Sequence, residues 1–159
     1  MPKALVETID SHHRNLLRAL DRVEALVRTP TSRDQFAAAI EAVRRGLLGH
    51  ELTAERFVVG PLCDLRLLVH GELDALGAEL AHLSEEAVRL AVGAPDPEAI
   101  AAFLRDVRDH IERKTRAVGP AARAAAAAGR LPAVPRWYVE EVYAQHGDPD
   151  ARPHEEWLG

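Results

Sequence analysis

The sequence predicts an all-α protein: a four-helix bundle in antiparallel up-down order with a short C-terminal helical extension. Aromatic residues make up only 4 % of the 159 residues while alanine and leucine are abundant, which favours helix over sheet. Apolar residues recur at helical spacing along four long segments, and these segments are separated by glycine and proline clusters. We therefore expect a bundle over residues 1–122 and an extension over residues 123–159, which packs on the bundle or is partly extended.

The first two long helices are predicted over residues 3–28 and 33–59. Ser32 follows a Thr-Pro-Thr break and is a suitable N-cap for the second helix. The Gly60-Pro61 pair is expected to end that helix. The inward stripe of the first helix contains Leu16, Leu17, Leu20, Val23 and Leu26, and that of the second contains Phe36, Ile40, Val43, Leu47, Ala54 and Phe57.

The third long helix is predicted over residues 62–92, and a Gly-Ala-Pro-Asp-Pro sequence separates it from the fourth. The fourth is expected to run from about residue 98 to the Gly119-Pro120 pair. A short alanine-rich helix over 121–128 and a last amphipathic helix over 137–145 would then form the extension.

One histidine lies on the apolar stripe of each of the four long helices. Because a bundle buries the four stripes in one core, the imidazoles could converge on one point, and imidazole is a good ligand for iron, zinc, copper or nickel. Residues four apart share a helix face, so His70 and Asp74 can offer a nitrogen and an oxygen to the same cation. The four histidines are His13, His50, His70 and His110.

Four stretches of the sequence resemble the haemerythrin-like, HHE cation-binding family. The resemblance covers roughly residues 5–122 and implies a four-helix bundle with a non-haem di-iron centre that binds oxygen or handles its reactive products. It implies ligands at His13 on the first helix, at His70 with Asp74 on the third, and at His110 on the fourth. The stretches are IDSHHRNLLRAL, HELTAERFVVGPL, VHGELDAL and RDHIERKTRAVGP.

The second helix departs from the family's His-x-x-x-Glu pattern and leaves two interpretations open. Ala54, four residues after His50, cannot bind a metal, whereas Glu55 stands at the family's usual distance before Pro61. One extra residue absorbed by a π-bulge would bring Glu55 into the site. Alternatively, Glu51 and Glu55 form the i, i+4 pair, and His50 lies slightly off the site.

The fourth helix departs further, because Lys114 stands where the family's bridging carboxylate is expected. Its spacing from Val107 and His110 directs it toward the core. A buried ammonium must be paired, neutral or extended to solvent, and Asp74 is the expected partner by position, with Glu55 as the other candidate. We therefore expect fewer than two tightly bound iron ions per chain.

The leading functional hypothesis is a haemerythrin-like protein with one or two non-haem iron ions that binds or processes dioxygen, peroxide or nitric oxide. Two other hypotheses follow from Lys114. In one, the bundle is metal-free or metal-poor and acts as a binding or regulatory module. In the other, the protein is an enzyme that uses Lys114 as a base or a substrate anchor. As alternatives to iron, the site would hold another divalent metal or none.

The composition excludes several other classes. A net charge of -5 with interleaved basic residues argues against a nucleic-acid-binding face. The N-terminus has no signal-peptide apolar region and no apolar run reaches the roughly 18 residues of a membrane span, so we expect a cytoplasmic protein. Cys63 is the only cysteine, which rules out an intrachain disulfide.

Overall fold

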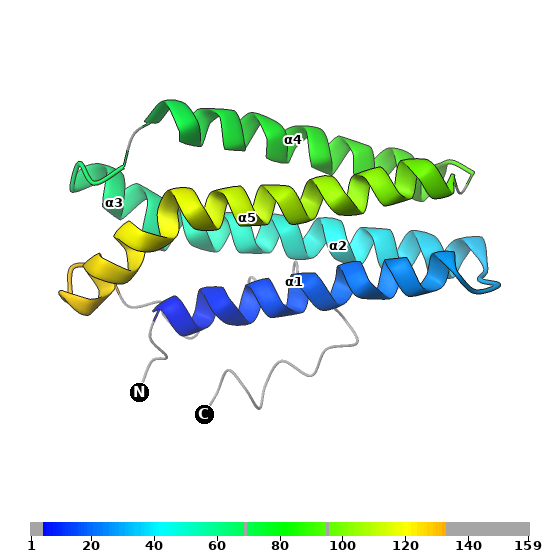
Figure 1. The fold of residues 1–159 in the computed structure, drawn as a ribbon, viewed down its shortest axis with the longest axis horizontal. Helices are drawn as coiled ribbons and strands as arrows, with labels where there is room; N and C mark the ends of the chain where they lie inside the picture. Colours follow the sequence, from blue (N-terminus) through cyan, green and yellow to red (C-terminus); the bar gives the residue numbers. More distant parts are fainter. Residues whose placement is uncertain (1–4, 69, 95, 133–159) are drawn as a thin grey trace.

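The computed structural model describes residues 5–68, 70–94 and 96–132, except for the side chains at positions 5–12, 50, 52, 53 and 70. These residues form an all-α bundle without a strand, which confirms the predicted fold class. Four long helices lie side by side along the long axis (Figure 1), and each packs most extensively against two of the others. They are α1 (Leu5–Val27), α2 (Arg33–Ala54), α4 (His70–Val92) and α5 (Pro97–Ala127).

Side-chain caps determine where two of these helices begin. At the start of α2, the backbone N–H of Gln35 donates to Ser32 Oγ, and the backbone N–H of Ser32 donates to Gln35 Oε1, each over 3.2 Å. This reciprocal capping box confirms the N-cap predicted at Ser32. At the start of α5, the carboxylate of Asp96 accepts backbone hydrogen bonds from Glu98 and Ala99, and Pro97 occupies the first turn.

The chain between α2 and α4 differs from the prediction. Gly60-Pro61 does not end the helix, because a π-helical turn, η1 (Glu55–Val59), and a short helix, α3 (Gly60–Asp64), continue directly from α2. Pro61 has no backbone N–H to donate, and it follows directly on the π-helical turn, in which the N–H of Gly60 donates to the carbonyl of Glu55. The break comes later, at Arg66 with its positive φ of 57°, so the third long helix begins at His70 and not at residue 62.

The fourth long helix also passes a predicted stop. Helix α5 continues through Pro120 to Ala127, so the separate helix predicted over 121–128 is the end of α5. Pro120 removes one backbone hydrogen bond, but Val118 and Ala122 on either side of it are buried, and their packing holds the helix together. Figure 1 shows the last part of α5 inclined to the rest, as expected where a proline kinks a helix.

Two apolar clusters fill the bundle. The first is formed by α1, α2, α4 and α5, and the second by η1, α3 and the end of α5. Along α2, Leu47 belongs to the first cluster and Phe57 of the adjoining η1 to the second, while the buried Glu51 lies between them. Along α5, His110 and Lys114 lie between Val107 of the first cluster and Val118 of the second. A polar level therefore separates the two apolar clusters.

The predicted helix over 137–145 lies outside the described residues. Within the described part of the chain, no helix combines the length and the apolar character needed to cross a bilayer.

Candidate metal centre

A fully buried histidine from α5 lies at the centre of the polar level. His110 has no exposed surface, and each of its ring nitrogens faces a carboxylate from a different helix. Nδ1 is 3.0 Å from Glu79 Oε2 on α4, and Nε2 is 3.3 Å from Glu51 Oε1 on α2. The imidazole therefore connects three of the four long helices through hydrogen bonds.

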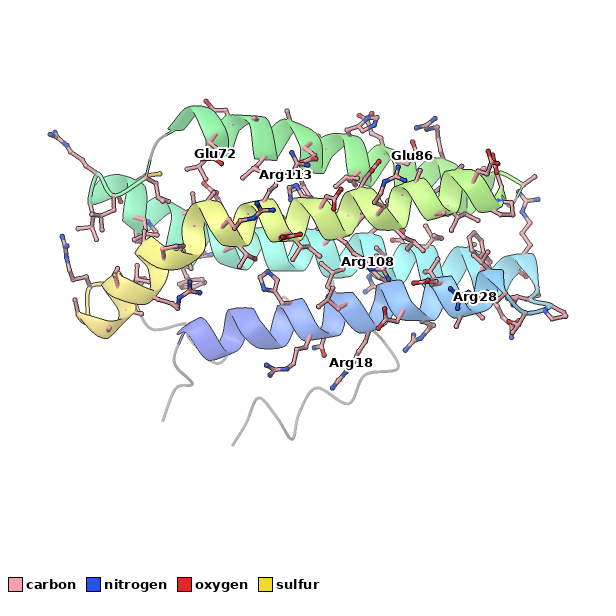
Figure 2. The ribbon with its side chains drawn as sticks, viewed as in Figure 1. Arg18, Arg28, Glu72, Glu86, Arg108 and Arg113 are labelled. Atoms are coloured by element: carbon pink, nitrogen blue, oxygen red, sulfur yellow. The ribbon has the colours of Figure 1, made fainter. Side chains whose placement is uncertain are left out.

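Lys114, one turn after His110, completes the arrangement around Glu51. Its side chain is buried, and its ammonium donates to Glu51 Oε2. On the other side of His110, Arg113 donates to the second oxygen of Glu79 and lies on the side of α5 toward α4 (Figure 2). We call these five residues, Arg113, Glu79, His110, Glu51 and Lys114, the internal network.

The internal network shifts the ionisation of its own members. Burial raises the pKa of Glu51, but the hydrogen bond from His110 and the charge of Lys114 outweigh it, so the pKa falls below its usual value. The pKa of Glu79 is lowered in the same way by His110 and Arg113, against burial. Burial lowers the pKa of His110, but its hydrogen bonds to the two carboxylates outweigh burial and raise it. Both carboxylates are thus held as anions.

These shifts predict a stability maximum for the metal-free protein. Because the pKa of His110 is raised, its contribution is present below the unfolded value of about 6.5 and is lost as the pH rises through the folded pKa. Because the pKa values of Glu51 and Glu79 are lowered, their contribution is present above the unfolded value of about 4.3 and is lost as the pH falls. The urea concentration at the midpoint of unfolding, measured across pH, should fall on both the acidic and the alkaline side of this maximum.

The variant His110→Gln tests whether His110 causes the fall in stability on the alkaline side. It should lose the decline above about pH 6.5, whereas His82→Gln, a change at an exposed histidine of α4, should keep it. An equal alkaline decline in wild type and His110→Gln would show that another group is responsible.

The predicted ligands are distributed unevenly in the structure. His110 is buried in the internal network and His13 is half-buried on α1, whereas Glu55 and Asp74 are exposed. The side chains of His50 and His70 lie outside the described residues, so convergence of the four imidazoles stays a prediction. His70 begins α4 nine residues before Glu79, which is about 13 Å along a helix axis.

The carboxylate that α2 contributes to the core is Glu51. A π-helical turn is present, as one interpretation of the sequence required, but it begins at Glu55 and does not precede it. The backbone N–H of Gly60 donates to the carbonyl of Glu55 five residues earlier, so the extra residue is absorbed after Glu55. Glu55 therefore keeps its outward direction, while Glu51 is only 9 % exposed.

Lys114 faces the core as its spacing predicts, but its expected partner was wrong. The ammonium binds Glu51 on α2, and neither Asp74 nor Glu55 lies in the core. The sequence reasoning also missed Glu79. That residue lies three positions after Leu76 and four before Leu83, both buried, so an acid on the inward stripe of α4 was the available signal.

The donor types of the internal network suit non-haem iron, since facing helices supply imidazole and carboxylate ligands in di-iron bundles. However, both ring nitrogens of His110 and all four carboxylate oxygens already have partners. Among the described side chains, no three His, Cys, Asp or Glu are arranged to hold a metal ion. A metal therefore does not fit at Glu51 and His110 while Lys114 stays in place.

Comparison with known families assigns the bundle. The model of the haemerythrin HHE cation-binding domain matches residues 4–122, a range that contains every member of the internal network. No curated protein and no solved structure matches the chain. The family match extends over well more than half of the sequence and includes the first three long helices and most of α5. The chain therefore belongs to the haemerythrin HHE cation-binding family.

Proposed function

We propose that this protein is a non-haem iron protein that binds or processes dioxygen, peroxide or nitric oxide. The observation that carries the proposal is the match to the HHE cation-binding domain over residues 4–122. The buried His110, Glu51 and Glu79 supply donors of the kind found in non-haem iron sites, which become free for a metal once Lys114 leaves Glu51. Apolar clusters on both sides of this level would shield a bound ion from water. Iron with an open coordination position could then take a small ligand.

The proposed ligands combine the family resemblance with the structure. His13, His50 and His70 remain proposed ligands from the resemblance, together with His110, although His70 lies about 13 Å along the axis of α4 from Glu79, which contacts His110. Glu51 replaces Glu55 as the proposed carboxylate of α2, because Glu51 is buried and Glu55 is exposed. The exposed position of Asp74 lends no support to a ligand role.

Metal analysis of protein purified without a histidine tag tests the proposal. After anaerobic incubation with Fe(II) and gel filtration, we expect retained iron at fewer than two ions per chain, because Lys114 occupies the bridging position of the family. Exposure to nitric oxide should then give an iron-dependent absorption band. Two ions per chain with an oxo-bridge band would contradict the expected number of metal ions.

Two matched histidine variants make this test specific. His110→Ala should reduce the retained iron, whereas His82→Ala should not, because His82 is exposed on α4 away from the inward stripe. If the folded wild-type protein retains no iron, or if both variants retain as much as wild type, the proposal fails in its present form.

The ion pair between Lys114 and Glu51 favours a second candidate. In it, the bundle is metal-poor, the internal network takes the structural place of the metal centre, and the protein acts as a binding or regulatory module. Folded protein that retains no iron in the same analysis would support this second candidate.

A further inference from the structure

We propose that Lys114 is an internal cation that takes the place of a metal ion in the bundle core, and that a metal reaches Glu51 and His110 only by displacing it. The inference rests on the proposed function for the identity of the metal. Its structural basis is independent of that identity, because it concerns contacts within this chain.

The first argument is the burial of the Lys114–Glu51 pair. The Lys114 side chain is 9 % exposed and that of Glu51 is 11 % exposed, so water screens their charges only weakly. A carboxylate held in such a place is costly without a cation. The cation that the chain provides is the ammonium of Lys114, at the family's bridging position.

The second argument is the charge of the internal network. Glu51 and Glu79 carry two negative charges, and Lys114 and Arg113 carry two positive charges, to which His110 adds a third when both of its ring nitrogens donate to the carboxylates. A divalent ion added at Glu51 and His110 would introduce two further positive charges close to the ammonium. Two cations bound to the same buried carboxylate repel each other strongly, so the ammonium of Lys114 and a metal ion cannot share Glu51.

The third argument is that the Lys114 side chain is long and flexible enough to carry its charge away from Glu51. Lysine carries its charge on a flexible four-carbon stem that can extend along apolar surface to water. Thr115 and Arg116, the residues that follow Lys114 on α5, are both exposed, so solvent is close to this part of the helix. Metal uptake is therefore a competition between a bound ion and the protein's own ammonium.

The test measures the Fe(II) dissociation constant of intact protein by anaerobic competition with a chelator at one pH. Lys114→Met removes the charge and keeps the length of the stem. We expect it to bind Fe(II) about tenfold to a hundredfold more tightly than wild type, because the buried ion pair no longer has to be broken.

Arg116→Met is the matched control. It removes one positive charge from the same helix, but Arg116 pairs with Glu112 at the surface over 3.1 Å, and both side chains are about two-thirds exposed or more. Its dissociation constant should equal that of wild type. If Lys114→Met fails to fold, Lys114→Gln removes the charge while keeping a hydrogen-bond donor for Glu51.

Each outcome separates this inference from the proposed function. Tighter binding by the Lys114 variant alone supports the inference, even if wild type retains no iron and the proposed function fails. Equal binding by wild type and the folded Lys114 variant overturns the inference and leaves the proposed function standing. If Arg116→Met binds Fe(II) as tightly as Lys114→Met does, the tighter binding reflects only the loss of one positive charge from the protein, and the inference is overturned. The absence of Fe(II) binding in every folded variant overturns both.

Discussion

Glu51→Ala is expected to lower the free energy of unfolding of the metal-free protein by about 3–5 kcal/mol, because it leaves a buried cation without its partner. Glu51 holds the ammonium of Lys114 and a ring nitrogen of His110 at the same time. Neither Lys114 nor His110 has much access to water, which could otherwise replace the lost carboxylate. Urea denaturation followed by circular dichroism at neutral pH measures this loss.

Glu55→Ala is the control for this prediction. Glu55 stands one turn later in the same helical segment but is exposed, so its removal should change the free energy of unfolding by no more than about 0.5 kcal/mol. The double variant Glu51→Met with Lys114→Met should recover most of the loss, because apolar side chains often replace a buried ion pair without net cost. A Glu51→Ala loss no larger than that of Glu55→Ala would show that the pair does not stabilise the bundle.

Phe103→Ala is expected to have an effect of similar size for a different physical reason. Phe103 is 2 % exposed and belongs to the first apolar cluster, where α5 packs against the other long helices. Truncation to alanine removes the buried ring and leaves a cavity that close-packed neighbours fill only in part. We therefore expect a loss of about 3–5 kcal/mol in the free energy of unfolding.

The same denaturation experiment checks this second prediction. Val92→Ala, at a residue of α4 that is 67 % exposed, should lie within about 0.5 kcal/mol of wild type. A Phe103→Ala loss below about 1 kcal/mol would mean that the cluster around Phe103 repacks or is not the main core of the bundle.

The long helices could be predicted from the sequence because their determinants are local. Apolar residues at helical spacing define the stripes, and the capping box at Ser32 and the N-cap at Asp96 mark two helix starts within a few residues of sequence. The same local rules failed at Pro61 and Pro120. A proline is tolerated in the first turn of a following helix, and tertiary packing can hold a helix together across one.

At the candidate site, the sequence by itself determined that His110 and Lys114 share the inward face of α5, because that depends only on the period of one helix. It also carried the resemblance that the family match confirms. Only the tertiary structure decided that Glu51 and Glu79, and not Glu55 and Asp74, meet these two residues. The reason is that contacts between helices depend on their axial offset and rotation, and packing of the apolar clusters fixes both.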